Sequence, residues 1–273
     1  LLIRRVVKTI LRYVRANNVS IDVEFPIVLF GGIVRLPLIG TFDIESIWDV
    51  LRDRIYGLKI NGKWTIIDCG ANMGISTRIY ALQNRYGHVI AIEPNSEILP
   101  KLIRNTNDLK NVTILPIAVA PKSGYVELYV AKDHVASSLV KDYAKHKGRG
   151  VVKVHRVNAL TLNDVLKILH ISYVDLLLLD VEGLANDVLL ASYELLSKGV
   201  IKLVKVDLAD YDNPHDIHDL IVILMRAGYE VSIIENTLYA RKNNTIIMIM
   251  LGALSGLCID FVVNKVLPSN RLY

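Results

Sequence analysis

Cysteine is scarce in this chain of 273 residues, which contains only Cys69 and Cys258. The two thiols lie far apart in the sequence and in different kinds of segment. They therefore form neither a disulfide framework nor the close spacing of a cysteine-bound metal. This usage is typical of a reducing compartment, so we expect a cytoplasmic protein without structural disulfides and without a metal site.

The chain also lacks a broad excess of positive charge. Its 32 Lys and Arg residues exceed its 27 Asp and Glu residues by five, and residues 1–18 alone hold five basic residues and no acid. The remaining charges balance, and no patch of interleaved aromatic and basic residues is visible. Because nucleic-acid enzymes carry a wider basic surface, we expect no nucleic-acid partner.

A glycine-containing turn is the motif around which the sequence is organised. A β-branched run predicts a buried strand at 65–68, and residues 75–86 predict a helix. Glycines in the turn between them let the backbone approach a ligand, and the helix start offers free N–H groups to an anionic group. A second strand, 88–92, precedes an acidic residue placed to bind ribose hydroxyls. The candidate cofactor-binding residues are Asp68, Gly70, Ala71, Asn72, Gly74, Ser76 and Glu93.

This turn departs from the fingerprint of dinucleotide-binding proteins. The pattern G-x-G-x-x-G requires glycine at position 72, where the chain has Asn72. We expect an adenosine-type cofactor, and the alternative is a structural turn that binds nothing. A nicotinamide-dependent oxidoreductase would use the same fold and stays open as a further alternative.

Two carboxylates follow the most apolar run of the chain. Leu176–Leu179 predicts a fully buried strand, and Asp180 and Glu182 are the candidate catalytic residues beyond it. They can hold an amino group of the cofactor, accept a proton from a substrate hydroxyl, or bind a divalent cation. The alternative is that they only cap a helix expected at 184–197.

The alternation of strands and helices predicts the fold class. An α/β protein with a doubly wound, mostly parallel sheet is expected. The short connection at residues 235–236 makes the last strand antiparallel. The expected strands are 65–68, 88–92, 112–117, 173–179, 201–207, 229–234 and 237–241. The expected helices are 75–86, 95–108, 160–169 with Thr161 as N-cap, 184–197 and 215–227.

Three parts are expected along the chain. Residues 1–42 hold a basic amphipathic helix (1–17) and a β-hairpin (19–39), and residues 43–242 form the cofactor-binding domain, which begins with a helix. The helix 1–17 packs on the domain or lies on an anionic membrane surface. Residues 243–273 hold an apolar helix, which is a candidate membrane anchor.

That apolar stretch, 246–263, has 18 residues and one charge. As a helix it would span about 27 Å, close to the thickness of a bilayer core. Its alternative is to pack on the domain or on a second copy, since Gly252 and Gly256 let two helices approach closely. Membrane association, tail anchoring and a homodimer are therefore partner hypotheses.

Two further groups of polar residues are weighed as sites. Residues 124–158 are expected to form a hairpin and loop that overhang the carboxyl edge of the sheet, with His134 and His155 as proton acceptors or as solvated side chains. A second cluster runs from Asp207 to Asp219. Its His215 and His218 could share a helix face and a metal, but an acidic helix start explains the cluster without one.

Four segments together resemble one family. They are IDCGANMG at 67–74, AIEPN at 91–95, NVTILPIAVAPKSGYVELYV at 111–130 and VDLLLLDVEG at 174–183. Their order and spacing are similar to those of the FkbM family of S-adenosylmethionine-dependent methyltransferases, over roughly residues 33–241. The resemblance implies a Rossmann-like sheet of seven strands with an antiparallel last strand, the class I methyltransferase type.

The resemblance also implies a reaction. S-adenosylmethionine is the expected cofactor, and the expected reaction is O-methylation of a hydroxyl on a small molecule, a sugar or a lipid-linked glycan. The chain departs from the family at Leu178, where lysine is common, and at Ala185, where glutamate is common. A membrane-associated module that binds the cofactor without catalysis is therefore kept as an alternative.

Overall fold

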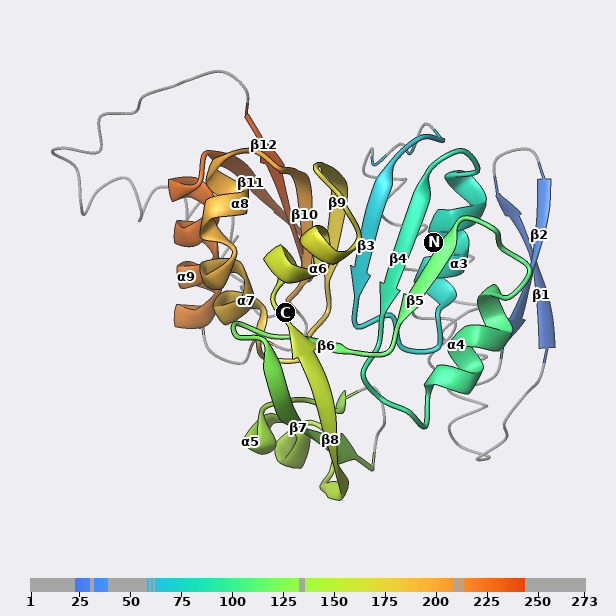
Figure 1. Ribbon diagram of the computed structural model, residues 1–273, viewed down its shortest axis with the longest axis horizontal. Helices are drawn as coiled ribbons and strands as arrows, with labels where there is room; N and C mark the ends of the chain where they lie inside the picture. Colours follow the sequence, from blue (N-terminus) through green and yellow to red (C-terminus); the bar gives the residue numbers. More distant parts are fainter. Residues whose placement is uncertain are drawn as a thin grey trace, which may run out of the picture.

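The computed structural model describes the strands 23–29 and 32–38 and residues 58, 60, 62–132, 136–208, 211 and 214–243 (Figure 1). The helices expected at 1–17 and at the start of 43–242 lie outside the described residues. The apolar segment 246–263 lies outside them as well. No helix of the described part combines the length and the apolar character needed to cross a bilayer.

A seven-stranded sheet forms the centre, in the order β11-β12-β10-β9-β3-β4-β5. Its strands are β3 (Thr65–Cys69), β4 (His88–Ile92), β5 (Val112–Leu115), β9 (Val174–Leu179), β10 (Ile201–Asp207), β11 (Tyr229–Ile234) and β12 (Thr237–Lys242). Neighbours from β10 to β5 pair in parallel, whereas β12 is antiparallel to both β10 and β11. The expected doubly wound sheet with an antiparallel last strand is confirmed.

The strand order changes direction between β3 and β9. Strand β3 pairs with β4 on one side and with β9 on the other, so the chain leaves the centre towards one edge and then returns to continue towards the other. In open α/β sheets ligands bind beyond the carboxyl ends of the strands at this switch point. The turn after β3 and the residues after β9 both lie there.

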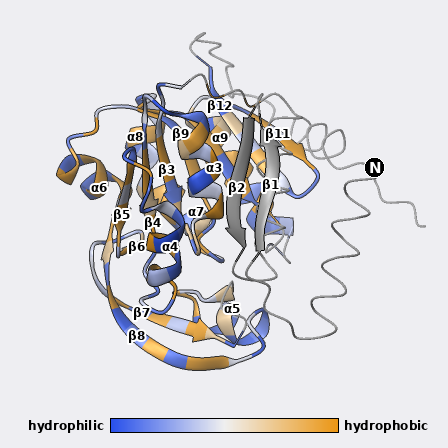
Figure 2. Cartoon of the chain, turned by 90° about the vertical axis from the view of Figure 1, so that its right-hand side faces the viewer, coloured by the Kyte–Doolittle hydropathy of each residue, from blue (hydrophilic) through white to orange (hydrophobic). Residues whose placement is uncertain are grey.

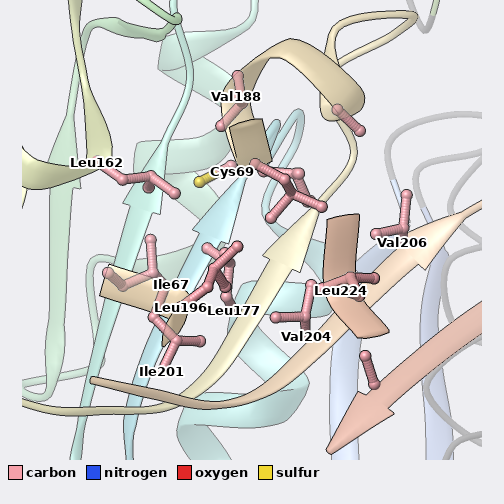
Figure 3. Close-up of a cluster of buried hydrophobic side chains, with 14 of the residues drawn as sticks. Ile67, Cys69, Leu162, Leu177, Val188, Leu196, Ile201, Val204, Val206 and Leu224 are labelled. Atoms are coloured by element: carbon pink, nitrogen blue, oxygen red, sulfur yellow. The ribbon is translucent and has the colours of Figure 1, made fainter. Parts of the chain in front are cut away.

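Helices cover both faces of the sheet. They are α3 (Ile75–Gln83), α4 (Leu99–Thr106), α6 (Leu162–Ile168), α7 (Ala185–Ala191), α8 (Tyr193–Ser197) and α9 (Pro214–Arg226). Helices α3 and α4 pack on the face that carries Ile66 and Leu176, and α6 to α9 pack on the opposite face with Ile67 and Leu177. Figure 3 shows this second cluster, in which Cys69 is a buried apolar side chain.

Some helix and strand ends differ from the expected ones for local reasons. The helix expected at 95–108 begins at Leu99, because the Asn95 side chain accepts a hydrogen bond from the N–H of Glu97 and forms a turn first. The helix expected at 184–197 is divided at Ser192, which lies between α7 and α8. Strand β5 ends before Pro116, which has no N–H to donate. The Thr161 N-cap is confirmed, since its hydroxyl accepts from the N–H of Asp164.

A smaller sheet is inserted between β5 and α6. It contains β6 (Ala118–Val119), β7 (Gly124–Ala131) and β8 (Val151–Leu160), in the order β6-β8-β7, and α5 (Lys141–His146) connects β7 to β8. Both views show the β7–β8 ribbon and α5 beyond the edge of the main sheet (Figures 1 and 2). The expected hairpin is therefore present as β7 and β8, but the bounds of β8 and the helix α5 were not predicted.

The N-terminal hairpin expected at 19–39 is also present in the backbone. Strands β1 (Val23–Leu29) and β2 (Gly32–Leu38) pair antiparallel, and Leu29 is the partner of Gly32 at the turn end. The hairpin is therefore confirmed, but Gly32 already belongs to β2, and the connecting positions 30–31 lie outside the described residues.

Candidate functional site

Asp68 joins the end of β3 to the start of α3. The side chain is 3% exposed, and its Oδ2 accepts hydrogen bonds from the hydroxyls of Ser76 (2.9 Å) and Thr77 (2.6 Å). Burial raises the pKa of Asp68, while the two hydroxyls and the ammonium group of Lys205 act in the opposite direction. Asp68 thereby fixes the first turn of α3 relative to the sheet, and Thr77 is a participant that sequence reasoning missed.

The glycines of the turn are required by the protein's own packing. A Cβ on Gly70 would lie 1.8 Å from the carbonyl oxygen of Asp180, and one on Gly74 would lie 2.3 Å from a methyl carbon of Leu102 in α4. Both glycines have positive φ, 84° and 80°. Gly70 therefore allows the turn to touch the residue after β9, and Gly74 allows α3 to approach α4.

Backbone hydrogen bonds hold the turn against β4. The N–H groups of Gly70 and Ala71 both donate to the carbonyl of Ile92, at 2.9 and 3.0 Å, and the N–H of Gly74 donates to Ala71. These amides are used inside the protein. The N–H of Asn72 is used as well, since it donates to Glu93. The expectation that the turn offers backbone N–H groups to a ligand is therefore narrowed to the start of α3.

Glu93 is the second buried carboxylate of the site and is 7% exposed. Its two oxygens accept from the N–H of Asn72 (2.9 Å) and from the N–H of Asn95 (2.8 Å). Burial raises the pKa of Glu93 to about 7, and the charge of Asp68 adds to this effect, although the two N–H groups oppose it. Glu93 therefore ties the glycine turn to the loop after β4, a structural task that its sequence position did not reveal.

Asn72 provides a polar atom to which a ligand can donate a hydrogen bond. Its backbone has a φ of 47°, a region that asparagine adopts more readily than most residues. Its side-chain Oδ1 is buried without a hydrogen-bond partner among the described residues. A buried acceptor of this kind costs about 1–3 kcal/mol until a donor reaches it. The hydroxyls and the ammonium group of S-adenosylmethionine are such donors, so the residues present fit this cofactor.

The residues after β9 form the other half of the site. Asp180 is exposed, and its N–H donates to the carbonyl of Cys69 at 3.0 Å. Glu182 has a φ of 43°. Its carboxylate accepts from the hydroxyl of Tyr143 at 2.6 Å, and its carbonyl accepts from the hydroxyl of Ser138 at 2.6 Å. The strained backbone of Glu182 is therefore held in place by the inserted segment.

Tyr143 was not among the expected site residues. It lies on α5, and its ring carbon is 3.1 Å from the position of a Cβ on Gly183. The polar run around it resembled a solvated loop, and no motif marks it. Ser138, the second residue of this segment that holds Glu182, was not among the expected site residues either.

The other candidate residues have different surroundings. His155 contacts Glu97 in the loop after β4 (3.2 Å), together with Lys153 (2.7 Å), and His134 lies outside the described residues. His218 contacts its neighbour Asp219, and the described residues contain no group of His, Cys, Asp and Glu side chains that could hold a metal.

Replacement of Gly70 by alanine tests the contact between the turn after β3 and the residues after β9. Gly62 serves as the matched control, because its φ of 87° is nearly the same and its Cβ would meet nothing closer than 3.7 Å. We expect Gly62→Ala to cost about 1–2 kcal/mol of unfolding free energy from backbone strain, and Gly70→Ala to cost at least about 2 kcal/mol more from the clash. Denaturant unfolding measures both, and equal losses would contradict the assignment.

The buried Glu93 predicts a dependence of stability on pH. Its pKa of about 7 in the folded protein exceeds the 4.5 of an ordinary glutamate. Its protonation therefore stabilises the fold fully below pH 4.5, and this contribution is lost as the pH rises through 7. We expect the difference in unfolding free energy between the wild type and Glu93→Gln to fall by about 3 kcal/mol over this range. A difference that stays constant from pH 4.5 to 7.5 would show that Glu93 titrates normally.

Comparisons with known structures give weak similarities to methyltransferases. Methanococcus jannaschii fibrillarin, a pre-rRNA processing protein, is 14% identical over 72% of this chain and 75% of that chain, with a TM-score of 0.44. Aeropyrum pernix fibrillarin with natively bound S-adenosylmethionine is 11% identical over 70% and 74%, with a TM-score of 0.43. Geobacter metallireducens precorrin-6y C5,15-methyltransferase is 13% identical over 71% and 88%, also with a TM-score of 0.43.

The sequence comparison is more specific. No curated protein sequence matches the chain significantly, but a family model described as the methyltransferase FkbM domain matches residues 68–231. This is more than half of the chain, and it includes the turn after β3 and the residues after β9. The match favours a methyltransferase over a nicotinamide-dependent oxidoreductase. The chain therefore belongs to the FkbM family of S-adenosylmethionine-dependent methyltransferases, whose cofactor is the one expected from the sequence.

Proposed function

We propose that the protein transfers a methyl group to a hydroxyl oxygen of a small molecule, a sugar or a lipid-linked glycan. The observation that carries this proposal is the fixed carboxylate of Glu182. Tyr143 donates to this carboxylate, and Ser138 donates to the backbone carbonyl of Glu182. Both bonds hold Glu182 at the edge of the sheet next to Asp180, whose carbonyl touches the turn at Gly70. A carboxylate in this place can receive the proton that a hydroxyl must lose.

The chemistry requires alignment and one proton acceptor. When bound, S-adenosylmethionine supplies a methyl group on a positively charged sulfur. A hydroxyl that accepts this methyl group must be aligned with it and must lose its proton, which a carboxylate held beside it would receive. We assign proton acceptance to Glu182, whose orientation is fixed, and contact with the acceptor to Asp180, which is exposed.

On the cofactor side, we assign separate roles to the candidate residues. Asp68 and Ser76 hold the start of α3, and Gly70, Ala71 and Gly74 give the turn its shape, as their contacts indicate. We propose that Asn72 and Glu93 bind the ribose and the amino-acid part of the cofactor. The unpartnered Oδ1 of Asn72 supports this assignment.

The two departures from the family occupy packed positions. Leu178 is buried in β9 on the face of α3, and Ala185 is buried at the start of α7. Neither side chain replaces Asp180 or Glu182. We therefore favour an active enzyme over a module that only binds the cofactor.

We also propose where the acceptor is met. Residues 246–263 are apolar over a length that matches a bilayer, which supports association with a membrane on the cytoplasmic side and a lipid-linked acceptor. The two glycines of this stretch support a homodimer as an additional arrangement. The balanced charge of residues 19–273 supports the absence of a nucleic-acid partner.

A transfer assay with the full chain tests the acceptor class. S-adenosylmethionine labelled in its methyl group is offered with a polyprenyl diphosphate-linked oligosaccharide, with methyl glycosides, or with an RNA oligonucleotide. We expect label in an alkali-stable ether of a sugar. We expect Asp180→Asn and Glu182→Gln to lower transfer at least a hundredfold, while calorimetry gives cofactor affinities within threefold of the wild type. Label in the RNA alone, or full activity of both variants, contradicts the proposal.

Tyr143→Phe tests whether α5 fixes the proton acceptor. A hydrogen bond donated to a carboxylate favours the charged form of that carboxylate. Loss of the Tyr143 hydroxyl should therefore shift the acidic limb of the pH–rate profile to higher pH by about one unit, and it should lower kcat about tenfold. Cofactor affinity should not change. Tyr129→Phe is the matched control, because the Tyr129 hydroxyl donates to Glu127 on the same inserted sheet. The same pH shift in both variants would mean that the effect is general.

A further inference from the structure

Three side chains from neighbouring strands lie in one row across the main sheet. Asp68 of β3 pairs in register with Leu178 of β9, and Leu178 pairs in register with Lys205 of β10. Two positions earlier, Ile66, Leu176 and Leu203 form the same row and pack against α3. Because side chains alternate along a strand, Asp68, Leu178 and Lys205 all lie on the face of α3.

Asp68 needs a positive charge on this face. Its carboxylate is nine-tenths or more buried, and a buried carboxylate stays charged only when donors and cations compensate for lost water. Ser76 and Thr77 supply two hydroxyl donors. Lys205 is the one cation in the described part of the chain whose charge lowers the pKa of Asp68.

The second carboxylate of the site increases this need. Glu93 lies near enough to Asp68 for the charge of Asp68 to raise its pKa. Two carboxylates that repel one another make the charged form of each less favourable. A lysine on the α3 face offsets this repulsion from the side opposite to Glu93, because β9 and β10 lie on one side of β3 and β4 lies on the other.

Leu178 lies between the two charged side chains of this row. Leucine cannot supply a charge, and it leaves apolar surface between Asp68 and Lys205. Lys205 on β10 is therefore the cation that this row offers to Asp68.

We propose that Lys205 is a positioning residue for the cofactor turn. Its ammonium group favours the charged form of the Asp68 carboxylate and so helps to hold Ser76 and Thr77 at the start of α3. Lys205 acts through Asp68 and does not touch the acceptor. This role concerns cofactor binding, so it does not depend on which hydroxyl is methylated.

The test measures the affinity of the full chain for S-adenosylmethionine by calorimetry at pH 7. We expect Lys205→Met to weaken binding about tenfold, the size of one buried polar interaction. Lys202→Met is the matched control, because Lys202 is an exposed lysine of the same strand, and it should leave affinity unchanged. Lys205→Arg, which keeps the charge, should remain within threefold of the wild type.

A double-mutant cycle and a charge relocation separate positioning from a general structural effect. In an Asp68→Asn background, Lys205→Met should weaken binding less than twofold further, because the interaction has already been removed. The double variant Leu178→Lys with Lys205→Met should regain affinity to within threefold of the wild type.

The proposal fails under three outcomes. Additive losses in the Asp68→Asn background would show that Lys205 does not act through Asp68. No recovery on moving the lysine to position 178 would show that the charge on this face is not what matters. Equal losses for Lys202→Met and Lys205→Met would assign the effect to net charge. Thermal unfolding of each variant confirms that the compared proteins are folded.

Discussion

The close approach of Gly70 to Asp180 is the constraint on which the site depends. A Cβ at position 70 would lie 1.8 Å from the Asp180 carbonyl oxygen, and the N–H of Asp180 donates to Cys69 on the other side of the same contact. The cofactor turn after β3 and the carboxylates after β9 are therefore parts of one rigid edge. This backbone contact fixes the position of the residues after β9 relative to the turn after β3.

Two buried carboxylates give that edge its internal order. Asp68 holds the start of α3, and Glu93 holds the middle of the turn and the loop after β4. Burial of a charge is unfavourable, and in both residues burial raises the pKa. Each carboxylate accepts hydrogen bonds from two nearby groups, and these bonds offset part of the free-energy cost of burial. The same arrangement leaves the Oδ1 of Asn72 buried without a hydrogen-bond partner among the described residues.

The strands of the main sheet could be predicted from the sequence almost completely. Each strand is a short, continuous apolar run, often of β-branched residues, which is not typical of a helix of that length. Glycine, proline or acidic residues follow these runs and end them. Strands β4, β10 and β11 have the predicted bounds. Helix α5 was missed for the opposite reason, because its residues are mainly polar and exposed. The bounds of β8 were missed because few of its side chains are buried, and its pairing with β7 makes it regular.

The sequence likewise predicts one half of the candidate site, around Asp68 and Glu93, and misses the contacts of the other half, around Glu182. The hydrogen bonds of Asp68 and Glu93 join residues at most 21 positions apart, and a motif in the sequence can record such local relations. The bonds that hold Glu182 join residues 39 and 44 positions apart. Tyr143 and Ser138 reach Glu182 only after the β7–β8 ribbon has folded over the edge, so a linear pattern contains no fixed spacing for them.

The two halves of the candidate site differ in how freely their sequences can change. The cofactor half is built from short-range contacts around β3 and β4, and any change there disturbs buried carboxylates or the glycine contacts. The inserted segment lies outside the main sheet and meets the site through Ser138 and Tyr143. Its exposed positions can vary while these two bonds persist. Acceptor preference is therefore expected to follow the sequence between β6 and β8, whereas family membership follows the turn after β3.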